Sequence, residues 1–297
     1  MIKRTLYFGN PAYLSLKDKQ ILVSFPEEKE PRKAPIEDTG IVILDHARIT
    51  ITQPLISSLL DNNIALVTCN GKHMPQGMLL NLEGHHTQQA NLTAQIETTK
   101  ALKDRLWKQV IQQKIENQAG LLQQNDVKAE NMLYWAKEVN NGDPENYEGR
   151  AAANYWKKLF DSEFIRGRFE EGPNVLLNYG YAILRAIVAR SLVGSGLHPS
   201  FGIHHHNKYN AYCLADDMME PYRPFVDQLV LQIMESEPEW GELTTDIKSM
   251  LLLIPTLDVV INKKRSPLMV AVQQTTASLV KCYLKEEKKL KLPKWLI

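Results

Sequence analysis

The stretch IALVTCNGKHMPQGMLLNLEGHHTQQ, residues 64–89, separates two parts of the chain that have different sequence patterns. Its first six residues, IALVTC, are typical of a buried strand, and the following Asn-Gly pair signals a turn. The pattern then fades, and we expect a linker over residues 76–90. The stretch therefore predicts a first domain over residues 1–75 and a second domain over residues 91–297.

Short β-type segments fill the region before this boundary. They are rich in β-branched and aromatic residues, and turn residues or a charged, proline-containing loop separate them. The segments are KRTLYF (3–8), AYLSL (12–16), QILVSF (20–25) and GIVILD (40–45). One helix follows over residues 54–63, with proline at its start and an apolar face. The pattern predicts a small β-sheet domain with one helix.

Helical periodicity replaces the strands after the boundary. A long helix begins near Thr98, and its apolar positions are Leu102, Leu106, Val110, Ile111 and Ile115. Its more polar sides hold Lys103, Arg105, Lys108 and Lys114. Similar patterns predict helices over residues 129–139, 151–160, 175–192, 224–236 and 267–289. The expected fold class is α+β: a small N-terminal β-sheet domain with one helix, then a larger all-α C-terminal domain.

Composition narrows the class of protein. The 297 residues are 44% hydrophobic and 23% charged, as in an ordinary globular protein. The net charge of +1 neither indicates nor excludes nucleic acid, because a phosphate-binding stripe can be local. Three cysteines, far apart and without a CxxC spacing, fit a reduced cytosol and argue against a thiolate zinc site. With no apolar signal segment and no long apolar run, we expect a soluble cytoplasmic protein without a membrane partner.

The segment GIHHHNKYNAYCLADDMMEPYR, residues 202–223, is the strongest candidate for chemistry. The chain has no GxxxxGK[ST], HExxH or GxSxG motif, which removes the usual signatures of several enzyme classes. Imidazole and carboxylate groups together suit a divalent cation such as Mg²⁺ or Mn²⁺. The segment's potential ligands are His204, His205, His206, Asp216, Asp217 and Glu220, and Glu148 in NYEGRAAANYW is a further acid upstream.

Spacing alone leaves alternatives open. Asp217 and Glu220 share a face if their segment is helical, but the prolines nearby are equally compatible with a kink or a helix start near Glu220. The histidines could form a solvated loop, and the aspartates could be first-turn acids favoured by a helix dipole. Glu148 could form a surface ion pair that contributes little.

Several stretches together resemble the CRISPR-associated Cas-one integrase family, which inserts new spacers into CRISPR arrays. The resemblance covers nearly the whole chain, and its detail is most like the type II versions. The stretches are KAPIEDTGIVILD (33–45), NNIALVTCNGKHMPQGMLL (62–80), RLWKQVIQQKIENQAGLL (105–122), YEGRAAANYW (147–156) and the block GPNVLLNYGYAILRAIVARSLVGSGLHPSFGIHHHNKYNAYCLADDMMEPYRPFVD (172–227).

The resemblance implies a metal-binding triad. It places Glu148 in the catalytic glutamate position and His205 at the fourth position of the GIHH segment. The third ligand position matches Glu220, with Asp217 as a neighbour in reserve, and no family role falls on His204 or His206. Mg²⁺ or Mn²⁺ is the expected cofactor.

The resemblance also implies an activity and partners. The activity is integration of spacer DNA at the leader-repeat end of a CRISPR array, in which a 3′-hydroxyl attacks a phosphodiester. The partners are double-stranded DNA, a second copy of the chain through the N-terminal domain, a Cas-two protein in a heterohexamer-like complex, and the type II effector with accessory adaptation proteins, in a prokaryotic cytoplasm. Candidate DNA-binding residues are Lys157, Lys158, Arg166, Arg168, Lys263, Lys264, Arg265 and the lysine-rich tail from Lys281.

Two alternatives remain at this point. One is a metal-dependent nuclease or phosphodiesterase that cuts nucleic acid without joining strands. The other is a non-catalytic DNA-binding scaffold with a structural histidine segment.

Overall fold

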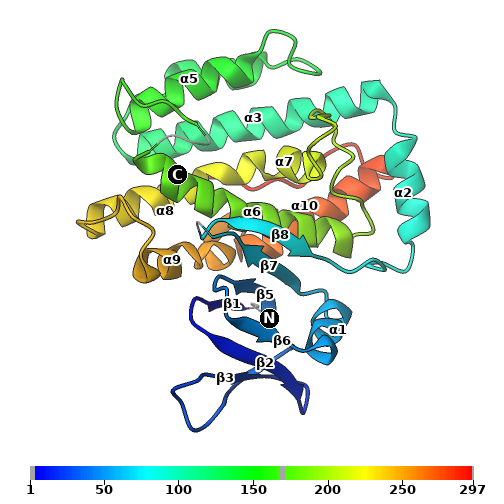
Figure 1. Ribbon diagram of the computed structural model, residues 1–297. Coiled ribbons are helices and arrows are strands. Elements are labelled where there is room, and N and C mark those ends of the chain that lie inside the picture. The colour runs from blue at the N-terminus through cyan, green and yellow to red at the C-terminus, as the bar shows by residue number, and fades with distance from the viewer. Residues whose placement is uncertain (1–3, 72, 168–170, 296–297) are drawn as a thin grey trace.

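The strands form one lobe and the long helices another (Figure 1). The computed structural model describes residues 4–71, 73–167 and 171–295. The first lobe contains β1 (Arg4–Phe8), β2 (Ala12–Lys17), β3 (Gln20–Ser24), β4 (Arg32–Pro35), β5 (Thr39–Leu44), β6 (Ile49–Ile51), α1 (Gln53–Asp61), β7 (Ala65–Cys69) and β8 (Pro75–Leu79). The second contains α2 (Gln88–Ile96), α3 (Lys100–Gln124), α4 (Glu130–Glu138), α5 (Tyr147–Leu159), α6 (Pro173–Gly194), α7 (Cys213–Met219), η1 (Glu220–Tyr222), α8 (Arg223–Ser236), α9 (Thr245–Leu251), η2 (Ile254–Thr256), β9 (Asp258–Ile261), β10 (Lys264–Pro267) and α10 (Leu268–Tyr283).

The predicted α+β class is confirmed, and the strand lobe is richer than predicted. Its strands form two sheets, in the orders β1-β5-β7-β8 and β4-β3-β2-β6. In the first sheet β1, β5 and β7 are parallel, and β8 runs antiparallel to β7. The short strands β4 and β6 lie in segments whose sequences show no clear alternation of buried and exposed side chains.

The structure differs from the predicted organisation in the linker, in the second domain and at the end of the last helix. The expected linker over residues 76–90 contains most of β8, which supplies the outer hydrogen-bonding partner of β7. The domain expected to be all-α also contains the hairpin β9–β10. The helix expected over residues 267–289 ends at Tyr283, because Lys285 adopts a left-handed conformation (φ 62°) that interrupts helical hydrogen bonding.

The two faces of the first sheet bury their side chains in different cores. Ile41, Ile43 and Val67 belong to the large core of the helical lobe, whereas Val42 and Leu66 belong to the small core of the strand lobe. Side chains alternate between the faces of a strand, so β5 and β7 contribute to both cores. The sheet therefore joins the lobes through an apolar interface.

A buried ion pair also joins the lobes. Asp45, at the end of β5, accepts a hydrogen bond of 2.8 Å from Lys248 Nζ of α9 and one of 2.5 Å from Tyr7 Oη. His73 Nδ1 lies 2.9 Å from the other carboxylate oxygen. Burial alone would raise the pKa of Asp45, but hydrogen bonds from Lys248, Tyr7 and His73 outweigh it and lower that pKa. The carboxylate is therefore held ionised between the lobes.

Helix α6 is the central helix of the large core. By length and composition it could cross a membrane, but 78% of its apolar window is buried inside the protein. It packs against α7, α8 and α10 (Figure 1). Its hydrophobicity is therefore explained by these neighbours.

Candidate active site

Glu148 lies in the first turn of α5, and its neighbours fix where that helix begins. The Asp143 carboxylate accepts the backbone N–H groups of Tyr147 and Glu148, each at 2.9 Å. Asn146 adopts a left-handed conformation (φ 54°), and its Oδ1 accepts the backbone N–H of Gly149 at 3.1 Å. Both side chains satisfy N–H groups that a helix start leaves unpaired. Glu148 is thus set at a defined point beside α3.

Glu220 begins the short 3₁₀ turn η1 between α7 and α8. The prolines nearby were compatible with a continuous helix, a kink or a helix start, and the structure shows that the helix is interrupted at Glu220. Pro221 follows directly, and Pro224 lies in the first turn of α8. Asn117 of α3 donates a 2.7 Å hydrogen bond to the carbonyl oxygen of Pro221. The turn is therefore tied to α3, and the Glu220 side chain is only 3% exposed.

Lys114 of α3 brings the two glutamates together. Its Nζ lies 2.7 Å from Glu148 Oε1 and 2.6 Å from Glu220 Oε2. The prediction that Lys114 lies on a polar side of its helix is wrong, since it is buried. It sits three and four residues after Ile111 and Val110 and therefore shares their buried face. Two carboxylates from different elements thus converge on one cation.

Neighbouring charges keep Lys114 and Glu220 ionised. Burial alone would lower the pKa of Lys114, but the carboxylates of Glu220 and Glu148 outweigh it and raise that pKa. Burial likewise favours a neutral Glu220, but Arg223, with Nη2 2.9 Å from Oε1, and Lys114 lower its pKa. The site therefore holds two negative charges close together in a largely desolvated place.

Asp217 organises the loop that presents His205. Its carboxylate accepts the backbone N–H groups of Ile203, His204 and His205 at 2.7, 3.0 and 3.2 Å, and its Oδ1 lies 2.5 Å from His205 Nδ1. A Cβ on Gly202 would collide with the His205 carbonyl oxygen and lie 2.8 Å from Asp217 Oδ2. The glycine of the GIHH segment is therefore required by this close approach, and both oxygens of Asp217 are engaged by the loop.

The same contact fixes the chemistry of His205. The hydrogen bond with Asp217 raises the pKa of His205 against the effect of burial, and the charges of Asp217, Glu220 and Glu148 raise it further. The imidazole also packs edge-on against Trp107 of α3, the helix that carries Lys114, with ring centroids 5.7 Å apart. With Nδ1 engaged by a carboxylate, Nε2 is the ring nitrogen left to accept a cation, as in carboxylate–histidine–metal arrangements.

The flanking histidines and Asp216 have other partners. His204 stacks on Trp107 of α3, with ring centroids 4.1 Å apart. His206 is exposed, and its Nδ1 lies 2.6 Å from the His204 carbonyl oxygen. Asp216 pairs with Arg185 at 2.6 Å. These contacts engage the flanking side chains within the loop and on α3 and α6, whereas Glu148 and Glu220 converge on Lys114.

The donor set suits a divalent cation, although the side chains are not gathered around a single point. Within residues 4–71, 73–167 and 171–295, no three His, Cys, Asp or Glu side chains form a ready metal cluster. Glu220 Oε2 is buried and has an ion partner but no hydrogen bond, so it retains acceptor capacity toward a cation. Two carboxylates and one imidazole are ligands that magnesium or manganese accepts.

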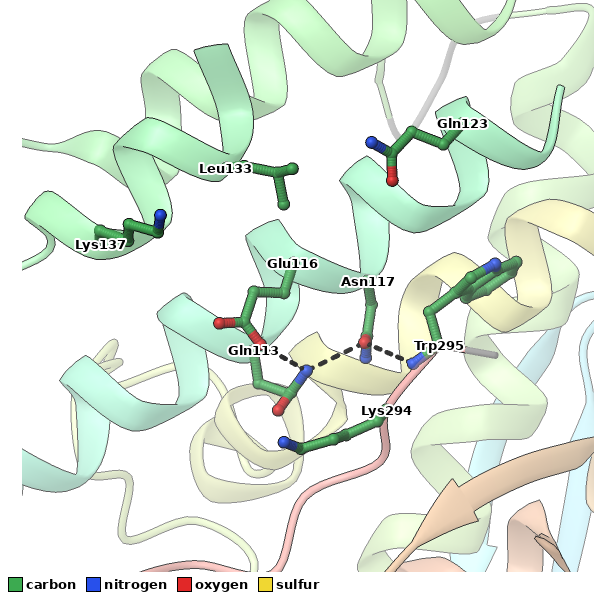
Figure 2. Close-up of a pocket in the computed structure, with 8 residues that line it drawn as sticks. All are labelled: Gln113, Glu116, Asn117, Gln123, Leu133, Lys137, Lys294 and Trp295. Atoms are coloured by element: carbon green, nitrogen blue, oxygen red, sulfur yellow. Dashed lines mark hydrogen bonds between the residues drawn. The ribbon is translucent and has the colours of Figure 1, made fainter. Parts of the chain in front are cut away.

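A cleft lies on the side of α3 next to Lys114. It has a volume of about 270 Å³ between α3, α4 and the C-terminal tail, and Figure 2 shows its lining: Gln113, Glu116, Asn117, Gln123, Leu133, Lys137, Lys294 and Trp295. None of the three predicted ligands lines it. Asn117 bonds here to the backbone of Pro293 and Trp295 as well as to Pro221, so the tail and the turn of Glu220 share one anchor.

The predicted DNA-binding residues fall into different environments. Lys263, Lys264 and Arg265 are exposed on the β9–β10 hairpin, and Lys157 is exposed on α5. Lys158 donates to the Lys128 carbonyl oxygen at 2.6 Å. Arg166 is largely engaged inside the protein, donating to Asn174 and Asn178 at 2.9 and 2.8 Å. Arg168 lies outside the described residues.

A buried acid behind the site provides a pH-dependent prediction. Asp227 of α8 accepts hydrogen bonds from Tyr155 and Tyr181 at 2.6 and 2.5 Å, and burial raises its pKa to about 6. An aspartate with a raised pKa stabilises the fold most when protonated, so its contribution falls as pH rises from 4 through 6. Asp227→Asn removes this titration. The free energy of unfolding of the variant, relative to that of wild type, should therefore rise by about 3 kcal/mol between pH 4 and pH 6. Urea unfolding at several pH values measures the difference, and a constant difference would contradict the assignment.

Sequence comparisons identify the family. The family profile described as CRISPR associated protein Cas1 matches residues 6–238. The CRISPR-associated endonuclease Cas1 of Neisseria meningitidis serogroup C (strain 8013) is 34% identical over 299 residues, covering 100% of this chain and 97% of the relative.

Solved structures give the same result for the fold. A casposase bound to integration product has a TM-score of 0.78 at 19% identity, over 98% of this chain and 92% of the casposase. A Cas6-RT-Cas1–Cas2 complex contains a chain with a TM-score of 0.75 at 18% identity, over 100% of this chain and 37% of that one. Fold and relatives together define a nuclease- or integrase-class protein of CRISPR adaptation. The chain belongs to the Cas1 family.

Proposed function

We propose that this protein is a divalent-metal-dependent DNA integrase that joins spacer DNA to the leader-repeat end of a CRISPR array. The observation that supports it most is the convergence of Glu148 and Glu220 on Lys114, together with a His205 imidazole that Asp217 orients. The family membership and the fold shared with a casposase bound to integration product support the joining reaction.

Glu148, Glu220 and the Nε2 of His205 would hold Mg²⁺ or Mn²⁺. The bound ion would polarise a phosphodiester and stabilise the charge that builds on its oxygens. The chain's own contribution is geometric: α5, η1 and the Asp217-held loop fix the three ligands on separate elements. No covalent protein nucleophile is needed, because an incoming DNA 3′-hydroxyl is the attacking group and holding it in line supplies much of the rate.

A joining assay tests this function directly. The full chain with a Cas2 partner is given Mn²⁺, a supercoiled plasmid bearing leader and repeat, and a labelled duplex with free 3′-hydroxyls. We expect labelled joint molecules from this duplex and none from a 3′-blocked duplex. Equal plasmid relaxation by both duplexes without a joint product would favour the plain nuclease. Metal-independent DNA binding without either product would favour the scaffold.

The proposed partners follow from the relatives and from the fold. Double-stranded DNA and Cas2 are proposed because similar structures include an integration product and a Cas1–Cas2 complex. We also propose a homodimer through the strand lobe, where Tyr13 is 50% exposed on β2. We further propose that the protein works with a type II effector and accessory adaptation proteins, and that it is located in the cytoplasm. Light scattering on the full chain should report a dimer, and Tyr13→Lys should weaken it; a wild-type monomer at micromolar concentration would exclude it.

The β9–β10 hairpin should contribute affinity for DNA without sequence preference. Neutralising Lys263, Lys264 and Arg265 together removes exposed charges that can contact phosphates. If all three do so, the slope of log affinity against log salt should become shallower by about 2–3, since each phosphate contact contributes roughly 0.9. Fluorescence anisotropy over a salt series measures the slope. Lys17→Ala on the strand lobe serves as a control, and an unchanged slope in the triple variant would exclude the hairpin from the DNA path.

A further inference from the structure

Lys114 is an unusual component for a metal centre. Its ammonium group lies within 2.7 Å of an oxygen of each proposed glutamate ligand, and its side chain is only 8% exposed. Arg223 contacts Glu220 through the other carboxylate oxygen, so it does not replace Lys114 at Oε2. Lys114 is thus the residue whose ammonium group contacts both glutamates, through Glu148 Oε1 and Glu220 Oε2.

Two carboxylates that converge, here the buried Glu220 and the partly exposed Glu148, repel each other unless a cation lies between them. We propose that Lys114 is a positioning residue that acts as a built-in counter-cation. It holds the carboxylates of Glu148 and Glu220 converged before a divalent ion arrives, and it then competes with that ion for the same oxygens. This inference rests on the proposed function, because the ion is the one assigned there.

The type of side chain fits this role. A lysine ammonium is a compact charge on a flexible four-carbon stem, whereas a guanidinium is a planar fork that binds a carboxylate rigidly. The stem allows the charge to change partners while α3 stays in place. Because the ammonium competes for the ligands, the centre should bind metal less tightly than its carboxylates alone would.

Metal-free stability and manganese binding test the inference without an activity assay. Wild type, Lys114→Met and Lys114→Arg are unfolded thermally in EDTA and in saturating Mn²⁺, and the dissociation constant of Mn²⁺ is measured by calorimetry. In EDTA, Lys114→Met should lower Tm by about 5–15 °C, since it leaves two carboxylates without their shared cation. Saturating Mn²⁺ should restore most of that loss, and Mn²⁺ should bind at least about tenfold tighter than to wild type. Lys114→Arg keeps the charge and should show no such tightening.

Two further variants make the result specific. Lys108→Met on the same helix controls for loss of a lysine from α3, and it should leave Mn²⁺ affinity unchanged. Glu148→Gln combined with Lys114→Met removes one carboxylate together with the cation, so its metal-free Tm should lie closer to wild type than that of Lys114→Met alone. This double variant also provides the test if Lys114→Met does not fold.

The outcomes separate the two proposals. Equal Tm loss with and without Mn²⁺, or Mn²⁺ binding to Lys114→Met that is no tighter than to wild type, would overturn the role of Lys114 and leave the metal site standing. No Mn²⁺ binding by wild type or by any variant would overturn the metal site itself and the inference with it.

Discussion

Glu148→Gln, His205→Ala and Glu220→Gln should each reduce the rate of strand joining by at least about 10³-fold, which corresponds to about 4 kcal/mol of lost transition-state stabilisation. Each change removes one of the three proposed ligands, which α5, the GIHH loop and η1 carry. The loss should appear in the yield of labelled joint molecules under single-turnover conditions.

Stability must be separated from chemistry in these variants. His205 is 44% exposed, so its removal should leave the fold intact. Glu220 is buried between two cations, and Glu220→Ala should cost roughly 3–5 kcal/mol because both cations would lose a partner. Glutamine keeps the shape and part of the hydrogen bonding and is the better test. Joining at near wild-type rates by a folded Glu148→Gln or Glu220→Gln protein would exclude the proposed centre.

Asp217→Asn should reduce joining by about 10–100-fold, because the residue orients a proposed ligand through a hydrogen bond. Its two oxygens accept three backbone N–H groups and face the Nδ1 of His205. An asparagine amide turned either way points an NH₂ group at two of these donors. The loop should therefore be destabilised by about 2–4 kcal/mol, even without metal.

Hydrogen exchange on metal-free protein measures this effect where it occurs. The amides of Ile203, His204 and His205 should exchange much faster in Asp217→Asn than in wild type. Asp216→Asn is the matched control, since Asp216 is adjacent and pairs with Arg185 and the Asn210 side chain instead of the three amides. Unchanged protection of the three amides in Asp217→Asn would show that its contacts with the loop contribute little.

The sequence indicated which residues are the candidate ligands better than it indicated how they are held. Resemblance placed Glu148, His205 and Glu220 in a common site, and the structure joins the two glutamates through Lys114. Periodicity alone could have flagged Lys114, because it lies on the stripe of Val110 and Ile111, but a lysine among apolar positions is normally assigned to a helix edge. Its partners come from segments 34 and 106 residues away, which no local pattern encodes.

Local sequence patterns also predicted only part of the fold. The strands with apolar, β-branched runs, such as the almost fully buried β5, were predicted from their own residues, and β8 was not. Its side chains are only partly buried, so its place is set by hydrogen bonds to β7 and not by a hydrophobic pattern. The contacts of Asp217 were equally hidden, because an acid thirteen or fourteen residues from the loop gives no short-range signal.

The sheet β1-β5-β7-β8, which contributes to both cores, holds the two lobes rigidly together. With Ile41 and Ile43 in one core and Val42 in the other, β5 cannot shift relative to either lobe without opening an apolar interface, and the Asp45–Lys248 pair resists the same movement. In a dimer joined through the strand lobes, the distance between the two glutamate pairs would be set by rigid parts and would vary little with temperature or load. The proposed dimer would therefore select DNA by its length, because it would accept DNA ends only when they span that distance.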